Sequence, residues 1–188
     1  MRYVLLSCLL AATAAPAAAQ DYRFANIPWG SDGATVKRLM VAQDFALEKA
    51  DSDGDYLFKG HLAGYDASVW ALMAKDALVK VDIILLTPDP KARQAYRDMK
   101  TLLTTKYGKA QAVEAFEKPY ADGDGNEDEA IKKGKAHFFA MWRKISGTDT
   151  SAIGLQISEY LNLLVGYESP RWDAEADRRR AKQAKELF

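Results

Sequence analysis

The segment from Asp89 to Gly108 is the feature that most constrains the fold. Asp89 suits an N-cap, Pro90 suits the first helical position, and Gly108 suits the left-handed residue that ends a helix. Between them, apolar side chains recur at three- and four-residue steps, as on one helix face: Ala92, Ala95, Tyr96, Met99, Leu102, Leu103 and Tyr107. The segment therefore predicts a long helix whose apolar face must be covered, and a sheet is the expected cover.

The segment from Met1 to Ala19 has the pattern of an export signal. An apolar run follows Arg2, and residues 17–19 are alanines, which fit the small-x-small rule for cleavage. The run is too short to span a bilayer. We expect cleavage after Ala19 and a periplasmic or secreted protein. Residues 5–8 resemble a bacterial lipobox, but so little precedes Cys8 that lipid anchoring there is the less favoured alternative.

Cleavage after Ala19 would remove Cys8, the single cysteine of the chain. The mature protein would then need no disulfide and would have no thiol for catalysis or metal binding. We expect residues 20–170 to form one domain, with halves at 21–87 and 89–169, and residues 171–188 to form a polar C-terminal helix or tail. The 26 basic and 26 acidic residues balance, so no overall field favours nucleic acid or an anionic membrane. No second apolar run predicts a transmembrane segment.

Most of the first half has the alternation of β-strands. The expected elements are a short strand at 21–27, a helix from Ser31 or Asp32 to about Ala42, a strand from Phe45, a turn at 51–55, and strands at 57–62, 67–73 and 78–86. No crossover helix fits between these strands, so an antiparallel meander is favoured.

The second half follows a similar plan. Residues 109–120 give no clear pattern, residues 122–129 predict a solvated acidic loop, strands are expected at 136–145, 151–158 and 161–168, and a helix at 171–187. Each half thus reads as a helix followed by about three strands, and residues 69–73 resemble residues 138–142. This suggests an internal repeat. The predicted fold is α+β, a two-layer sandwich of a mostly antiparallel sheet of six to eight strands with helices on one face.

A family resemblance covers residues 27–86. The order of Trp29 and Gly30, then Val36 and Leu39 on a helix, then a strand meander resembles the helix-plus-sheet unit of BamE/SmpA-like lipoproteins and of β-lactamase-inhibitor-protein-like folds. The resemblance implies a non-enzymatic adaptor or inhibitor of other proteins and carries over no functional residue. The chain departs from BamE in its poor lipobox and in its added second half.

Two pairs of side chains are candidate site residues. Trp70 and Trp142 fall in comparable strands of the two halves, so they either line an aromatic groove on an open sheet face or belong to the core. His61 and His137 are the only histidines, and with a carboxylate they would hold zinc if the fold brought them together. The leading hypothesis is a non-catalytic module that binds a protein, peptide or cell-wall component. The alternative is a metal-assisted hydrolase that uses the two histidines.

The remaining charged clusters favour solvated structure. The run of Asp51, Asp53 and Asp55 lacks the glycine and glutamate that an EF-hand needs at its sixth and twelfth positions. The five acids within 122–129 would bind a cation weakly at most. Residues 178–180 are three arginines, which form either an acidic-partner patch or one side of a solvated helix with pairs such as Glu175–Arg179. No cofactor or metal is expected.

Overall fold

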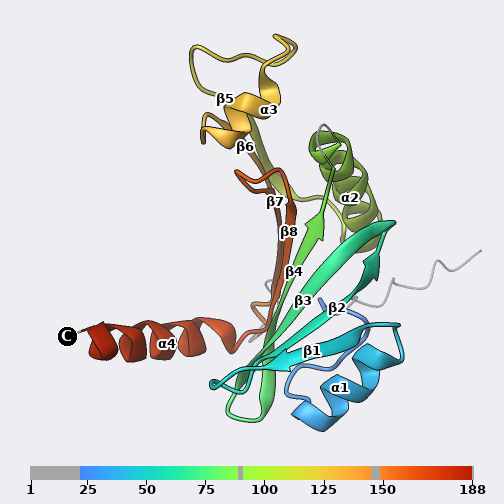
Figure 1. The fold of residues 1–188 in the computed structure, drawn as a ribbon, viewed down its shortest axis with the longest axis vertical. Coiled ribbons are helices and arrows are strands. Elements are labelled where there is room, and N and C mark those ends of the chain that lie inside the picture. Colours follow the sequence, from blue (N-terminus) through green and yellow to red (C-terminus); the bar gives the residue numbers. More distant parts are fainter. Residues whose placement is uncertain (1–21, 89–90, 145–148, 188) are drawn as a thin grey trace, which may run out of the picture.

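The computed structural model describes residues 22–88, 91–144 and 149–187. In these ranges the protein is an eight-stranded antiparallel sheet with four helices, which confirms the α+β class (Figure 1). The strands are β1 (Ala46–Ala50), β2 (Tyr56–Leu62), β3 (Tyr65–Ala74), β4 (Ala77–Leu86), β5 (Gln111–Phe116), β6 (Ala136–Arg143), β7 (Ala152–Ile157) and β8 (Leu163–Glu168). The helices are α1 (Gly33–Val41), α2 (Ala92–Tyr107), α3 (Glu127–Lys132) and α4 (Trp172–Leu187). The strand order is β1-β2-β3-β4-β8-β7-β6-β5.

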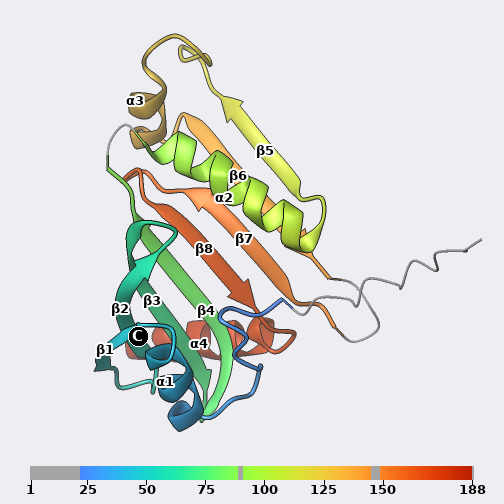
Figure 2. The ribbon, with the colours of Figure 1, turned by 90° about the vertical axis from the view of Figure 1, so that its right-hand side faces the viewer.

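The core lies between the sheet and the two helices α1 and α2, which cover the same face (Figure 2). Asp32 caps α1 by accepting a 2.7 Å hydrogen bond from the Thr35 backbone, and α1 contacts β1 and β4. The apolar stripe of α2 packs on β6, β7 and β8. Strand alternation sends every second side chain of β3 into this core, including Val69, Ala71 and Met73.

Two local expectations need correction, and a third lies outside the described residues. Residues 22–27 form no strand, because Ala25 and Asn26 have φ values of 49° and 57°, a left-handed conformation that breaks an extended chain. The unassigned segment 109–120 contains β5, so the second half has four strands, as does the first. Helix α2 begins at Ala92, and the expected cap at residues 89–90 lies outside the described residues, as do the export signal with Cys8 and residues 145–148.

The expectation that all helices cover one face fails for α4. This helix projects from the sheet on the side opposite α1 and α2 (Figure 1). Its first residue, Trp172, places its ring over Lys80, with Nζ 4.6 Å from the ring centroid, and Lys80 points away from the core. No helix in the described ranges combines the length and apolar character that crossing a membrane requires.

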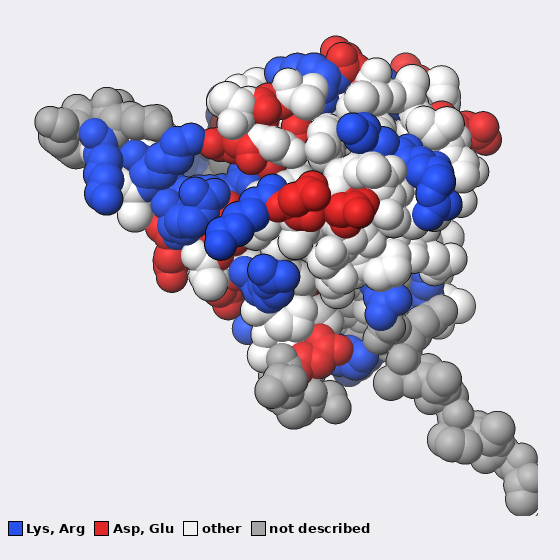
Figure 3. Space-filling view, turned by 90° about the horizontal axis from the view of Figure 1, so that it is seen from below, with Lys and Arg blue, Asp and Glu red and all other residues white. Residues whose placement is uncertain are grey.

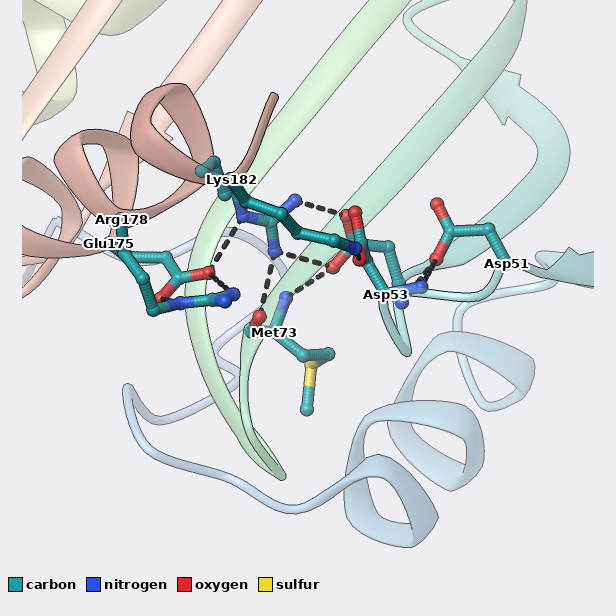
Figure 4. Close-up of polar contacts among 8 residues, drawn as sticks. Asp51, Asp53, Met73, Glu175, Arg178 and Lys182 are labelled. Carbon is teal, nitrogen blue, oxygen red and sulfur yellow. Dashed lines mark hydrogen bonds and ion pairs between the residues drawn. The ribbon is translucent and has the colours of Figure 1, made fainter. Parts of the chain in front are cut away.

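A buried ion-pair network anchors α4 to the body (Figure 4). Arg179 donates to both carboxylate oxygens of Asp55 at 2.6 and 2.9 Å, to the Met73 carbonyl at 2.7 Å and to Glu175 at 2.8 Å. Arg178 also donates to Glu175, at 2.6 and 2.8 Å. The expected Glu175–Arg179 pair is therefore present, but it is part of a tertiary contact because Asp55 and Glu175 are both buried. Beyond Arg179 the side chains of residues 180–185 are exposed, and basic groups crowd this projecting end (Figure 3).

Candidate binding groove

The candidate site is a groove on the uncovered face, which we define as the sheet face opposite α1 and α2. Strand alternation that buries Val69 and Val81 in the core turns Trp70, Asp82 and Ile84 toward this face. The groove has a volume of about 450 Å³ and crosses the sheet from β3 to β6. Its lining includes Trp70, Lys80, Asp82, Ile84, Phe139, Gly154, Gln156, Leu164 and Gly166.

Two glycines form the floor of the groove. Gly154 on β7 and Gly166 on β8 are direct cross-strand partners, and neither has a left-handed backbone. A Cβ at Gly154 would meet no heavy atom within 4 Å, whereas a Cβ at Gly166 would lie 3.1 Å from Oδ1 of Asp82. Glycine inside a regular element destabilises it by about 0.5–1 kcal/mol relative to alanine. The fold gives no packing reason for Gly154, and such a glycine often marks close approach of a ligand or another backbone.

Aromatic side chains stand on the two sides of this floor. Trp70 on β3 and Phe139 on β6 are four strand spacings apart, about 19 Å between their backbones. Ile84 and Leu164 lie between them as direct cross-strand neighbours of each other. On the side away from the floor, Lys49 places its ammonium 5.1 Å from the Trp70 ring centroid. The groove is thus a mainly apolar trough, wide enough for a segment of polypeptide.

Charged groups gather at the end of the groove next to α4. The Lys80 ammonium lies 3.2 Å from Asp82 and 3.1 Å from Glu168, so one cation serves two carboxylates. Lys80 is enclosed, with 17% of its side chain exposed, whereas 40% of the Asp82 side chain remains exposed. Burial in the groove raises the pKa of Asp82, while the charge and hydrogen bond of Lys80 act against this shift. The negative charge of Asp82 is therefore only partly neutralised by Lys80, and its carboxylate faces the groove.

The two tryptophans lie on opposite faces of the sheet. Trp70 lines the groove. Trp142 is 1% exposed in the core, and its indole N–H donates a 2.8 Å hydrogen bond to the Gly108 carbonyl at the end of α2. Only one member of the pair can therefore contact a ligand on the uncovered face.

The two histidines both face the uncovered side, but the structure does not bring them together. His61 on β2 and His137 on β6 are five strand spacings apart, about 24 Å. His61 pairs with Asp66 at 2.8 Å and His137 with Glu117 at 3.2 Å. In the described part of the chain, no group of three or more histidine, cysteine or acidic side chains is arranged to hold a metal ion. Each histidine instead lines a separate hollow beside the groove.

Sequence reasoning missed the floor and the charged end of the groove. Gly154 and Gly166 were visible as glycines inside strand-like segments, and such positions signal a bulge or a close approach. Lys80 and Asp82 also stood out as the charged positions of an otherwise apolar strand. What the sequence lacked was the pairing of β4 with β8, which places Asp82 directly opposite Gly166.

Comparison of the chain with protein-family models, with curated proteins and with solved structures finds no match.

Proposed function

We propose that this protein is an exported, non-catalytic binding module of a bacterial envelope, and that its uncovered sheet face takes a protein, peptide or cell-wall component. The observation that carries the proposal is Gly154. This glycine lies on β7, an interior strand of the sheet, and a Cβ added to it would meet no heavy atom within 4 Å. A ligand that approaches the backbone at this point accounts for it.

Export rests on the segment before the described residues. An apolar run behind Arg2 and the alanines at 17–19 favour passage through the inner membrane and cleavage after Ala19. Intact mass spectrometry of the protein isolated from its own envelope tests this directly. A mass equal to residues 20–188 supports soluble export, lipid on Cys8 would indicate an anchored adaptor, and a mass that retains Met1 would contradict export.

We also infer that the two halves derive from a repeated unit. Each half begins with one helix, α1 of nine residues or α2 of sixteen, and supplies four strands. The strand order runs outward from the central β4–β8 pair in both directions. Helices α1 and α2 cover the same face (Figure 2). This arrangement supports a duplication in which the groove forms where the two units meet.

The binding role is tested by filling the groove. Gly154→Leu adds a side chain where a Cβ meets no atom, so the fold should tolerate it while the groove is blocked. Ala115→Leu is the matched control, because Ala115 is exposed on β5 and lies on the same face outside the groove. Each protein is immobilised, and the molecules retained from envelope extract are quantified. We expect the main ligand to bind the wild type and Ala115→Leu but not Gly154→Leu. Equal retention by all three proteins would refute the binding role of this face.

A further inference from the structure

We propose that the groove takes an apolar polypeptide segment carrying a lysine or arginine, whose cation pairs with Asp82 beside the Trp70 ring. This inference rests on the proposed function and names the ligand of the same face. It follows from three features of the groove: an incompletely neutralised carboxylate, an aromatic ring next to it, and an elongated apolar trough that continues past it.

The carboxylate of Asp82 is only partly neutralised by its neighbours. Lys80 bridges Asp82 and Glu168, so the three groups together carry one negative charge. The Lys80 side chain is largely enclosed, and its ammonium lies over the Trp172 ring and at similar distances from both carboxylates. Asp82 keeps 40% of its side chain exposed, and that surface opens into the groove. An incoming ammonium or guanidinium would supply the missing charge, and charge-assisted hydrogen bonds are the stronger kind.

The aromatic ring of Trp70 lies next to this carboxylate. Trp70 is the direct cross-strand partner of Asp82, and both side chains line the groove. Cations are attracted to the faces of tryptophan rings, and a cation held at Asp82 would lie within reach of Trp70. Lys49 already makes this contact with Trp70 from the β1 side, which shows that the ring accepts a cation. The pair of Trp70 and Asp82 therefore favours a basic side chain over a neutral polar one.

The shape of the trough selects a polypeptide. The groove shares Ile84, Gln156 and Leu164 with the neighbouring hollow of about 520 Å³ that His137 and Tyr160 line. The hollowed surface thus continues across the face toward the turn between β7 and β8, where Ile157 and Tyr160 are mixed with polar groups such as Glu159. A compact ligand would fill only one of these spaces, whereas a chain with successive apolar side chains occupies both. The bare backbone at Gly154 leaves room for the main chain of such a segment.

The experiment selects peptides without assuming their sequence. A random heptapeptide library displayed on phage is panned on the wild-type protein, and clones that also bind Gly154→Leu are removed. Affinities of the remaining peptides are measured for the wild type, for Asp82→Asn and for Glu168→Gln. We expect a lysine or arginine among apolar residues in most selected peptides. We also expect about tenfold weaker binding to Asp82→Asn and a smaller change for Glu168→Gln, which lies outside the groove lining.

A second measurement distinguishes loss of the ion pair with Asp82 from a change in the fold of the variant. Replacing the basic residue of a selected peptide by norleucine should weaken binding to the wild type about tenfold and leave binding to Asp82→Asn unchanged. Peptides that depend on the groove but lack a basic residue, or that bind Asp82→Asn equally well, would overturn this inference and leave the binding role intact. The absence of any peptide sensitive to Gly154→Leu would also overturn it. The binding role of this face falls only if Gly154→Leu retains every ligand of the wild type.

Discussion

Replacing Arg179 with methionine should detach α4 from the body of the protein. The guanidinium donates two hydrogen bonds to Asp55, one to the Met73 carbonyl and one to Glu175, all between 2.6 and 2.9 Å. Methionine keeps most of the apolar stem and removes every one of these donors. Asp55, 4% exposed, then keeps the hydrogen bond that its carboxylate accepts from the Met73 backbone N–H at 2.7 Å.

The size of the effect follows from what each carboxylate retains. Removing one partner of a buried ion pair typically destabilises a protein by about 3–5 kcal/mol, because the other charge stays buried. Here Asp55 keeps one N–H and Glu175 keeps Arg178. The projecting helix can also swing away and admit water to both carboxylates, which limits the loss to the free energy of docking α4. We therefore expect a loss of about 3 kcal/mol.

Urea unfolding followed by circular dichroism gives the free energy of unfolding, and hydrogen exchange reports the opening of α4. Arg178→Met is the matched control on the same helix turn. The Arg178 side chain is 53% exposed and pairs with Glu175, so its replacement should reduce the free energy of unfolding by less than about 1 kcal/mol. Equal losses for the two variants, or normal exchange protection of α4 in Arg179→Met, would refute the anchoring role.

The same network predicts that the free energy of unfolding falls as the pH is lowered into the acid range. Hydrogen bonds from Arg178 and then Arg179 lower the pKa of Glu175, against the opposing effect of burial. A lowered folded pKa gives stability that is fully present above the unfolded pKa of about 4.3 and lost as pH falls through the folded value. Between about pH 5 and pH 3, Arg179→Met should lose less stability than the wild type, because part of this contribution is already gone. An identical loss in both proteins would contradict this.

Five further substitutions, arranged as three tests, probe the core and the groove. Tyr96→Phe should leave stability unchanged or raise it by about 1 kcal/mol, because the buried Tyr96 hydroxyl has no hydrogen-bond partner in the described structure; thermal unfolding measures this. Gly60→Ala should destabilise, since a Cβ there would lie 2.6 Å from an aromatic carbon, whereas Gly154→Ala should be tolerated, and urea midpoints compare the two. Trp142→Phe should lose about 2–4 kcal/mol through a cavity and a lost hydrogen bond, while Trp70→Phe should lose less than about 1 kcal/mol in urea unfolding and weaken ligand binding.

Strand alternation made most of the sheet predictable. Segments such as 67–73 and 78–86 bury one face, so their side chains alternate visibly between apolar and other groups. β5 has no such signal because it is an edge strand and nearly all of its side chains are exposed. The false strand at 22–27 contains apolar residues that do reach the core, but they do so from a turn at Ala25 and Asn26. Composition indicates burial there and not backbone conformation.

The similarity between residues 69–73 and 138–142 joins strands that hold different places in the two halves, because β3 is the third strand of the first half and β6 is the second strand of the second half. Matched position by position, it pairs Trp70 with Phe139 and Met73 with Trp142. The first pair points toward the uncovered face and the second pair is buried in the core. The groove therefore has Trp70 and Phe139 on its two sides, whereas the expectation from residue type alone had joined the two tryptophans.

The anchor of α4 lay beyond what sequence patterns reveal. Asp55 ends a run of acids that resembles an ordinary turn, and Arg179 sits in a run of arginines that resembles a solvated helix. The two residues are 124 positions apart, and only the tertiary fold brings them together. Periodicity describes which side of an element is apolar, but it does not identify the partner of a buried charge.

The ladder between β4 and β8 has a consequence for the order of folding. Every other ladder joins strands that are consecutive in the chain, so each four-strand unit can zip up from local hairpins. The β4–β8 seam closes a much longer loop and should therefore form last. Asp82 lies on one side of this seam and Gly154 on the other. A segment bound in the groove would thus contact both four-strand units. Its binding would stabilise the β4–β8 pairing that joins them.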